Sequence, residues 1–333
     1  MNTAVNPIRK SPNRAGGLRA VSFDASGLLP VVVVLALIAF FSVATSSFWT
    51  LRNLTALSGQ TGTLLIVCLG STFVVLMGSI DLSIGAIVLL VGAATVQLLN
   101  ATPLGFAVVP AAALAGALLG VLNGAIYAYG RVPSFVVTLG SLSVFSGAGL
   151  LLLGGRAIQF NFDGFDAIAI GQWVPRLPNI ALFGLIAWAL TVVVSARTRF
   201  GRYMFLIGGG ENIARTAGVP VRPYKIAAFG VSGLLAGLGA AFAVARLGAA
   251  GPSLGQDLLL NSLAAIVVGG TSLAGGVGGP QRTLLGVLII SILDDGLNLM
   301  GVSEYTQMIV KGLVVIAAVL VSRRGNTRAL IIK

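Results

Sequence analysis

"LLPVVVVLALIAFFSVATS", residues 28–46, decides the fold class of this chain, because it contains 19 residues and no charged side chain. A helix needs about 20 mainly apolar residues to cross about 30 Å of hydrocarbon. The stretch therefore predicts a membrane-spanning helix. The basic segment "RKSPNRAGGLRA" (9–20) before it would also suit a signal peptide. Because this segment is long and many apolar runs follow, we predict an uncleaved first span.

The whole chain has the same apolar character. Of its 333 residues, 56% are hydrophobic and only 9% are charged, whereas soluble domains average roughly 45–50% apolar and about 25% charged residues. Its 45 glycines suit helices that pack closely in lipid. We therefore predict an all-α, polytopic membrane protein. The net charge of +12 is explained by basic residues that flank spans, so no nucleic-acid partner is expected.

Apolar windows of spanning length recur along the chain and predict about ten transmembrane helices. The predicted spans lie at about 28–46, 55–78, 83–99, 105–129, 133–153, 179–195, 226–246, 257–270, 283–300 and 305–322. Eight or nine spans are the alternative, because the windows 83–99 and 257–270 are short or interrupted by glycine.

Lysine and arginine residues predict the orientation of these spans. With a cytoplasmic N-terminus, sixteen of them fall on cytoplasmic segments and four on outer segments, while Lys311 lies inside the last span. The four outer residues are Arg52, Arg156, Arg176 and Arg246. The count predicts basic cytoplasmic tails at 1–27 and 323–333 that flank a transmembrane domain at 28–322, with both termini in the cytoplasm.

Two turns hint at an internal repeat. "YGRVPSFVV" (129–137) and "MGVSEYTQM" (300–308) share a glycine, a valine and an aromatic residue at matching offsets, and they are predicted to face opposite sides of the membrane. An inverted five-plus-five repeat would produce this arrangement. Chance resemblance between two glycine turns is the alternative.

Several kinds of chemistry are excluded by residue type. The chain has no histidine, one cysteine (Cys68) inside an apolar run, and nine scattered carboxylates. It also lacks a phosphate-binding loop of the GxxxxGK[ST] type. We therefore predict no catalytic residue, no metal site and no cofactor in this chain, and no disulfide framework.

A few polar residues within the spans are candidates for function. Asp81 in "GSIDLSIG" is placed to cap a helix by accepting from the N–H of Ser83 or Ile84, with a substrate role as the alternative. Ionisable groups at membrane depth are costly, so Asp294 and Asp295 either form an acidic relay or pair with Lys311. The candidates for a pathway or gate are Asp81, Ser83, Thr138, Ser141, Asn261 and Asn298. Interhelical hydrogen bonding is the competing interpretation for Thr138, Ser141, Asn261 and Asn298.

The predicted cytoplasmic segment 196–225 contains about thirty residues, where helix connections usually have about 2–8. Within it, "ENIARTAG" (211–218) predicts a short helix that is opened by Asn212 or by the run Gly208–Gly210, and ended by Gly218 and Pro220. Glu211 and Arg215 lie four residues apart on it. We predict a docking surface for another protein. An ordinary positively charged loop is the alternative.

"TRFGRYMFLIGGGENIARTAGVPVRPYKIAAFGVSGLLAG" (198–237) resembles the coupling segment of the permease subunits of bacterial ABC importers for monosaccharides, the ribose, xylose, arabinose and galactofuranose group. The similarity continues at four further places. They are "GSIDLSIGAI" (78–87), "NGAIYAYGRVPSFVVTLG" (123–140), "VVGGTSLAGGVGG" (267–279) and "DDGLNLMGVSEYTQMIVKGLVVIAAV" (294–319).

The resemblance implies a permease that moves a monosaccharide or a related neutral polyol across the bacterial inner membrane by alternating access. It implies a second permease subunit, two ATP-binding cassettes that hold ATP and magnesium and dock on the loop helix, and a periplasmic sugar-binding protein. The coupling contact would include Gly208, Glu211, Asn212, Ala214, Arg215 and Gly218.

The chain departs from the pattern of this group in two places. "LLLNSLAA" (258–265) has Leu259 and Asn261 where similar permeases commonly carry an acidic pair, and Pro280 to Arg282 replace a "GxGxxxGT" motif. Both departures leave the particular substrate open. A proton-coupled secondary transporter that uses Asp81 or the pair Asp294 and Asp295 is the alternative function, although it leaves the loop 196–225 without a role.

Overall fold

The computed structural model describes residues 25–324, which form helices joined by short connections and one small two-stranded sheet. In chain order the elements are α1 (Ala25–Ala44), α2 (Leu51–Leu76), α3 (Ile84–Ala101), the 3-10 helix η1 (Gly105–Ala107), α4 (Val108–Gly130), α5 (Ser134–Leu153), β1 (Ile158–Gln159), α6 (Ala167–Ile170), α7 (Asn179–Arg197), α8 (Arg199–Gly209), α9 (Glu211–Thr216), α10 (Val221–Leu247), β2 (Ala249–Ala250), α11 (Gln256–Val268), α12 (Pro280–Leu299) and α13 (Glu304–Arg324). The predicted all-α fold is confirmed.

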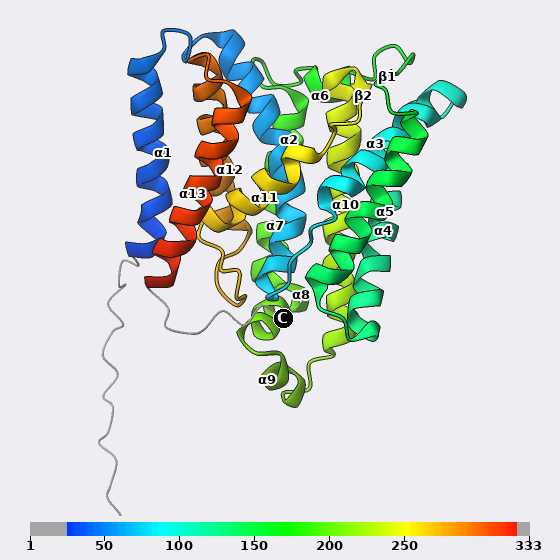
Figure 1. The fold of residues 1–333 in the computed structure, drawn as a ribbon, viewed down its shortest axis with the longest axis vertical. Coiled ribbons are helices and arrows are strands. Elements are labelled where there is room, and N and C mark those ends of the chain that lie inside the picture. The colour runs from blue at the N-terminus through cyan, green and yellow to red at the C-terminus, as the bar shows by residue number, and fades with distance from the viewer. Residues whose placement is uncertain (1–24, 325–333) are drawn as a thin grey trace, which may run out of the picture.

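The long helices run between two ends of the molecule (Figure 1). We call the end with α8 and α9 the lower end, and the end with α6 and the two strands the upper end. Helix α1 begins at the lower end and α13 finishes there (Figure 1). The predicted tails 1–27 and 323–333 lie almost entirely outside the described residues, and their boundaries stay predictions.

Every predicted span coincides with a helix, usually within a few residues of the predicted limits. Within residues 25–324, six helical stretches are long and apolar enough to cross a membrane, and the apolar part of α1 and helix α11 are shorter. The six stretches are Leu51–Leu76, Ile84–Ala101, Gly105–Gly130, Ser134–Leu153, Asn179–Arg197 and Val221–Leu247. A multi-pass membrane protein is therefore supported, while the total of about ten spans stays a prediction.

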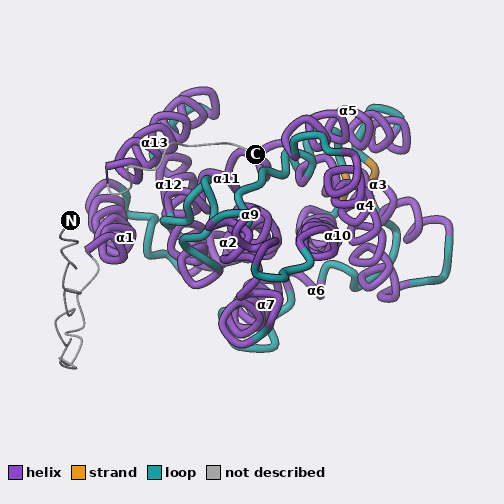
Figure 2. The backbone as a smooth tube through the Cα atoms, turned by 90° about the horizontal axis from the view of Figure 1, so that it is seen from below, coloured by secondary structure: helices purple, strands orange, loops and turns teal. Residues whose placement is uncertain are grey.

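Helices α2 and α10 occupy the centre of the bundle, with the other long helices around them (Figure 2). Buried side chains along α2 include Val67, Leu69 and Phe73. Helix α10 packs along α4 through small residues: a Cβ on Gly116 of α4 would overlap the backbone of Gly233. Such close approach lets dispersion forces hold helices together in lipid.

Two of the predicted spans form helices that follow a non-helical segment inside the bundle, and we call these two spans interrupted. Residues 77–83 lead without helix from the lower end of α2 to α3, and residues 248–255 lead from the upper end of α10, through β2, to α11. Helices α3 and α11 therefore begin part-way between the two ends (Figure 1). Irregular backbone at this depth is tolerated where protein buries it or where it lines a cavity. These two helix starts position the candidate sites described below.

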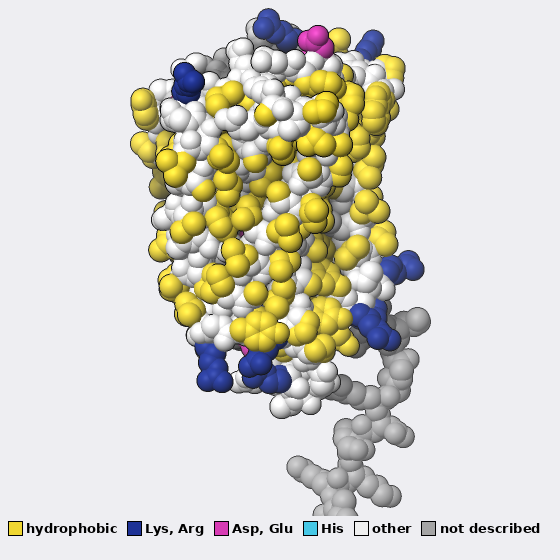
Figure 3. All heavy atoms as spheres, turned by 90° about the vertical axis from the view of Figure 1, so that its right-hand side faces the viewer, with side chains coloured by type: hydrophobic (Ala, Val, Ile, Leu, Met, Phe, Trp, Pro, Cys, Tyr) yellow, Lys and Arg dark blue, Asp and Glu magenta, His cyan; other side chains and the backbone are white. Residues whose placement is uncertain are grey.

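The outer surface between the two ends is apolar. Figure 3 shows hydrophobic side chains over this face, with lysine and arginine side chains mainly at its two rims. Leu118 on α4 and Leu139 and Leu151 on α5 are among the exposed apolar residues. A surface of this extent exposed to water would be unusual for a monomeric protein, so the structure is consistent with a belt that faces lipid.

Candidate transport and coupling sites

Helix α9, Glu211–Thr216, forms where the motif "ENIARTAG" predicts it. Gly210 precedes its first helical residue, and Gly218 follows its end with φ +81°, a left-handed conformation that glycine adopts without strain. Ala214 is buried against neighbouring apolar residues, whereas Ile213 is 74% exposed. Asn212 is exposed as well. An exposed isoleucine on a short surface helix is a suitable contact for another protein.

Glu211 connects α9 to the rest of the bundle. Its Oε1 lies 3.0 Å from Nη2 of Arg215, and its Oε2 lies 3.0 Å from Nζ of Lys225 at the start of α10. The Lys225 ammonium in turn lies 4.2 Å from the ring centroid of Tyr127 on α4, a favourable cation–π geometry. A displacement of α9 would therefore act on α4 and α10. The coupling role of Glu211 and Arg215 itself stays a prediction.

Gly208 lies on α8 rather than on the short helix. A Cβ at this position would overlap the carbonyl oxygen of Leu76 at the end of α2 and the N–H of Gly276. The N–H of Gly276 donates to the carbonyl oxygen of Leu76 at 2.8 Å. Gly208 is therefore placed to allow close packing between α8, the end of α2 and the loop before α12, and its part in the coupling contact stays a prediction.

Helix α8 itself was not expected from the sequence, which suggests only a loop before residue 211. Its hydroxyl cap is Thr198, which accepts from the N–H of Gly201 at 3.2 Å. Met204 and Ile207 are buried while Arg202 is exposed. The spacing of three residues between the buried Met204 and Ile207 is typical of a helix with one apolar face. The arginines and glycines in the same stretch made this pattern hard to recognise in the sequence.

Asp81 lies in the interrupted segment before α3 and is buried. Its Oδ1 accepts from the N–H of Ser83 at 3.0 Å and from the Ser83 hydroxyl at 2.6 Å, while its Oδ2 accepts from the Ser232 hydroxyl on α10 at 3.0 Å. The predicted acceptance from Ser83 is confirmed. The contact with Ser232 could not be predicted, because it joins residues 151 positions apart in the chain.

The hydrogen bonds continue from Ser83 to α4 and α5. The amide of Asn123 donates to the Ser83 hydroxyl at 2.8 Å and its oxygen accepts from the Ser141 hydroxyl at 2.6 Å. Thr138 donates to the carbonyl oxygen of Ser134 at 3.0 Å. Four of the predicted pathway residues thus lie in or beside one cluster that holds the segment 77–83 in place. This geometry favours hydrogen bonding between elements for Asp81, Ser83 and Ser141, whereas the Thr138 bond to Ser134 lies within α5. A pathway role for the four residues stays a prediction.

Asp294 and Asp295 have different partners. Oδ2 of Asp294 accepts from the amide of Asn261 on α11 at 3.2 Å, and its Oδ1 lies 3.3 Å from Nζ of Lys311 on α13. Asp295 instead accepts from the amide of Asn53 on α2 at 2.9 Å. The geometry favours an ion pair with Lys311 for Asp294, and it separates the two carboxylates into different contacts.

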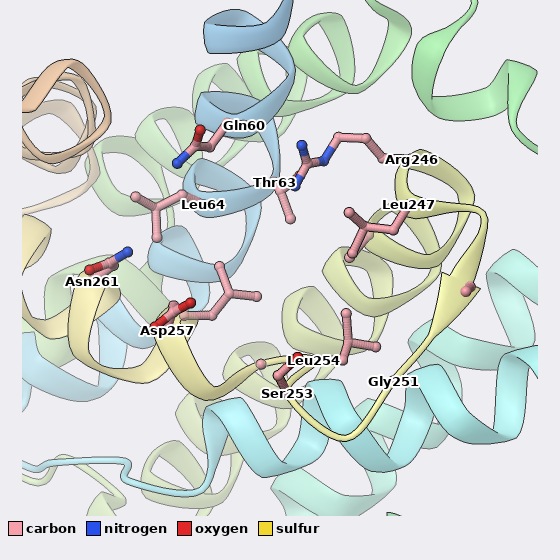
Figure 4. Close-up of a pocket in the computed structure, with 14 residues that line it drawn as sticks. Gln60, Thr63, Leu64, Arg246, Leu247, Gly251, Ser253, Leu254, Asp257 and Asn261 are labelled. Atoms are coloured by element: carbon pink, nitrogen blue, oxygen red, sulfur yellow. The ribbon is translucent and has the colours of Figure 1, made fainter. Parts of the chain in front are cut away.

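A cavity of about 380 Å³ lies between α2, the end of α10, the segment 248–255 and α11. Gln60, Asp257 and Asn261 lie on one side of it and Arg246 on the other (Figure 4). Ser253 lines it as well (Figure 4). With one arginine and one aspartate, the cavity wall combines opposite charges with uncharged hydrogen-bonding groups. Such a lining suits a neutral polar solute.

A second cavity, of about 310 Å³, shares Gln60, Asp257 and Asn261 with the first and adds Asn298 and Lys311. Of the predicted pathway residues, Asn261 and Asn298 therefore meet at a cavity, away from the cluster around Asp81. Sequence reasoning missed Gln60 and Asp257. In each case, a polar side chain at the edge of an apolar window was the sequence feature that could have indicated a cavity-lining residue.

Comparisons with known proteins show the family of this chain. Residues 53–319 match the family model described as "Branched-chain amino acid transport system / permease component". The chain belongs to this permease family. The permease is 37% identical to the ribose import permease protein RbsC of Escherichia coli (strain K12) over 298 residues, which cover 88% of this chain and 92% of that protein.

Two further relatives cover similar shares. The permease is 35% identical to the ribose import permease protein RbsC of Bacillus subtilis (strain 168) over 321 residues, 92% of this chain and 97% of that protein. It is 34% identical to the D-allose transport system permease protein AlsC of Escherichia coli (strain K12) over 309 residues, 91% and 93% of the two chains. No solved structure matches the permease.

Proposed function

We propose that this chain is the permease subunit of an ATP-driven ABC importer that carries a monosaccharide or a related neutral polyol. The observation that carries this proposal is the similarity along nearly the full chain to permeases named for ribose and allose. The balanced charge of Arg246 and Asp257 in the first cavity supports a neutral solute, because an ionic substrate at membrane depth needs an uncompensated charge of opposite sign.

We further propose ten spans arranged as an inverted five-plus-five repeat. The third and eighth predicted spans are the two interrupted ones, and they enter from opposite ends of the molecule (Figure 1). Interrupted helices at corresponding positions of two halves are typical of transporters with inverted repeats. The turns at 130–133 and 300–303 also lie at opposite ends (Figure 1), as the sequence echo between them requires.

The lower end would face the cytoplasm of a bacterium and the upper end the periplasm. The excess of basic residues on segments at the lower end supports this orientation, with both termini in the cytoplasm. Two cassettes that bind ATP and magnesium would dock on α9, where Ile213 and Arg215 are exposed. A second permease would complete the pathway, and a periplasmic sugar-binding protein would deliver the substrate at the upper end.

The proton-coupled alternative has no support from the relatives. Asp81 accepts hydrogen bonds from Ser83 and Ser232, and Asp294 pairs with Lys311. Structural roles account for both carboxylates.

Uptake of radiolabelled D-ribose and D-allose by whole cells tests the proposed function. We expect uptake to require both this permease and its cognate cassette gene. Continued uptake after deletion of the cassette gene, abolished by a protonophore, would contradict an ATP-driven importer. If neither sugar nor a panel of other neutral polyols enters wild-type cells in a permease-dependent way, the proposed substrate class is wrong.

A further inference from the structure

A third cavity, of about 430 Å³, lies at the lower end under the turn between α4 and α5. It is lined by the end of α4, the turn itself, α9 and the start of α10. We propose that this cavity binds the phosphate headgroup of an anionic phospholipid, with the acyl chains on the apolar surface of α4 and α5. The inference does not rest on the identity of the transported substrate.

The cavity carries a clear excess of positive charge. Arg131, Arg215, Arg222 and Lys225 line it, and Glu211 is the single carboxylate in the lining. Glu211 is bound by both Arg215 and Lys225. Two cationic side chains are left without a carboxylate among the described residues, namely Arg131 and Arg222. An anion is the ligand that this lining would attract.

The two remaining arginines differ in what they contact. The Arg222 guanidinium lies 5.5 Å from the ring centroid of Tyr129, which positions it without neutralising its charge. In the described part of the chain, the Arg131 guanidinium makes neither a hydrogen bond nor an ion pair, and the residue is exposed. Planar guanidinium groups bind phosphate oxygens through paired N–H groups.

The backbone of Arg131 is unusual as well. It has φ +55° and ψ +25° at the end of α4, in the left-handed region where a helix end normally carries glycine. A non-glycine residue there is strained, and such strain tends to occur at functional sites. Arg176 also has a left-handed backbone, so the backbone alone does not mark a site; at Arg131 it accompanies a guanidinium that lines a basic cavity.

The position of the cavity selects a lipid over a soluble anion. Tyr129 is 61% exposed, and Phe135 and Leu139 on the first turns of α5 are exposed as well. These residues border the lower rim of the apolar surface, where Figure 3 shows lysine and arginine side chains below hydrophobic ones. Basic pockets between membrane helices on the cytoplasmic side are known binding places for anionic headgroups.

Native mass spectrometry of the purified full-length permease, mixed with phosphatidylglycerol or with phosphatidylcholine of the same acyl chains, tests the proposal. The variant combines Arg131→Gly with Arg222→Gln. The matched control combines Arg176→Gly with Arg156→Gln, because Arg176 also has a left-handed backbone, with φ +69°, and is exposed on the upper side. Glycine suits both backbones, so neither variant is expected to misfold, and thermal unfolding verifies this.

We expect the wild type and the control to retain phosphatidylglycerol over phosphatidylcholine, and the Arg131/Arg222 variant to bind phosphatidylglycerol about tenfold more weakly or worse, since each basic residue near the surface contributes to attraction. Equal retention of the two lipids, or an equal loss in the control, would overturn the site. So would displacement of phosphatidylglycerol by millimolar inorganic phosphate, which would identify free phosphate as the ligand. If phosphatidylglycerol is displaced when the cassettes assemble with the permease, the cavity binds a carboxylate of a cassette protein and the lipid proposal is wrong.

Discussion

Gly85 and Gly255 touch where the two interrupted spans become helical. A Cβ on Gly85 would overlap the carbonyl oxygen of Gly255, and a Cβ on Gly255 would overlap that of Gly85. Helices α3 and α11 thus begin against each other in the interior, with Asp81 just before one helix and Asp257 in the first turn of the other. Carboxylates are favourable near helix N-termini because of the partial positive charge there.

Replacement of Gly85 by valine should separate these two helix starts. The obstacle is backbone rather than a flexible side chain, so we expect a loss of stability of about 3 kcal/mol and a strong reduction of transport. Thermal unfolding in detergent and uptake in cells measure the two effects. The control is Gly147→Ala on α5, where a Cβ meets no atom within 4 Å. Normal stability of the valine variant would show that the contact between α3 and α11 is loose.

Asp81→Ala tests whether this carboxylate is structural. It leaves the donors of Ser83 and Ser232 without an acceptor, and buried unsatisfied groups cost about 1–3 kcal/mol each. We expect a loss of about 3 kcal/mol in thermal unfolding, while Asp163→Ala, at an exposed position, stays near the wild-type value. If Asp81→Asn kept full stability but abolished transport, a direct role in ion or substrate movement would replace the structural one.

The positions of the long helices could be predicted because a span of about 20 apolar residues is a local signal. The interruption of two spans was indicated only weakly by the sequence, because the windows 83–99 and 257–270 are short and contain glycine. Their meeting at Gly85 and Gly255 could not be predicted, because it depends on how α3 and α11 pack across 170 positions of sequence.

For the candidate sites as well, a contact between residues close in sequence could be predicted, whereas contacts between distant residues could not. Glu211 and Arg215 pair within one short helix, so their spacing predicted the contact. Asp294 and Asp295 are adjacent in sequence, yet successive helix residues point about 100° apart, and the two carboxylates contact Lys311 and Asn53 separately. The cavity between Gln60 and Arg246 required α2 and α10 to be neighbours, which no local pattern in the sequence indicates.

The coupling role of α9 is tested by Glu211→Ala combined with Arg215→Glu. The change removes one ion pair to α10 and reverses a charge that is largely exposed, so we expect normal membrane insertion, lost cassette docking and no substrate-stimulated ATPase activity. Co-purification with the cassettes measures docking. The control, Asp163→Ala with Arg176→Glu, makes the same types of change at exposed positions on the upper side. Unchanged ATPase stimulation in the α9 variant would contradict the docking prediction.

Substitutions of Asp294 and Lys311 distinguish a structural ion pair from an acidic relay. Lys311→Met leaves the buried Asp294 carboxylate with the Asn261 amide as its remaining hydrogen-bond donor, and breaking a buried pair in this way costs about 3–5 kcal/mol. We expect Asp294→Asn combined with Lys311→Met to recover much of that loss, because no buried charge remains. A double-mutant cycle of unfolding free energies measures the coupling, and uptake is measured alongside. For a structural pair, transport should return together with stability in the double variant; a stable double variant without transport would identify Asp294 as part of the transport pathway.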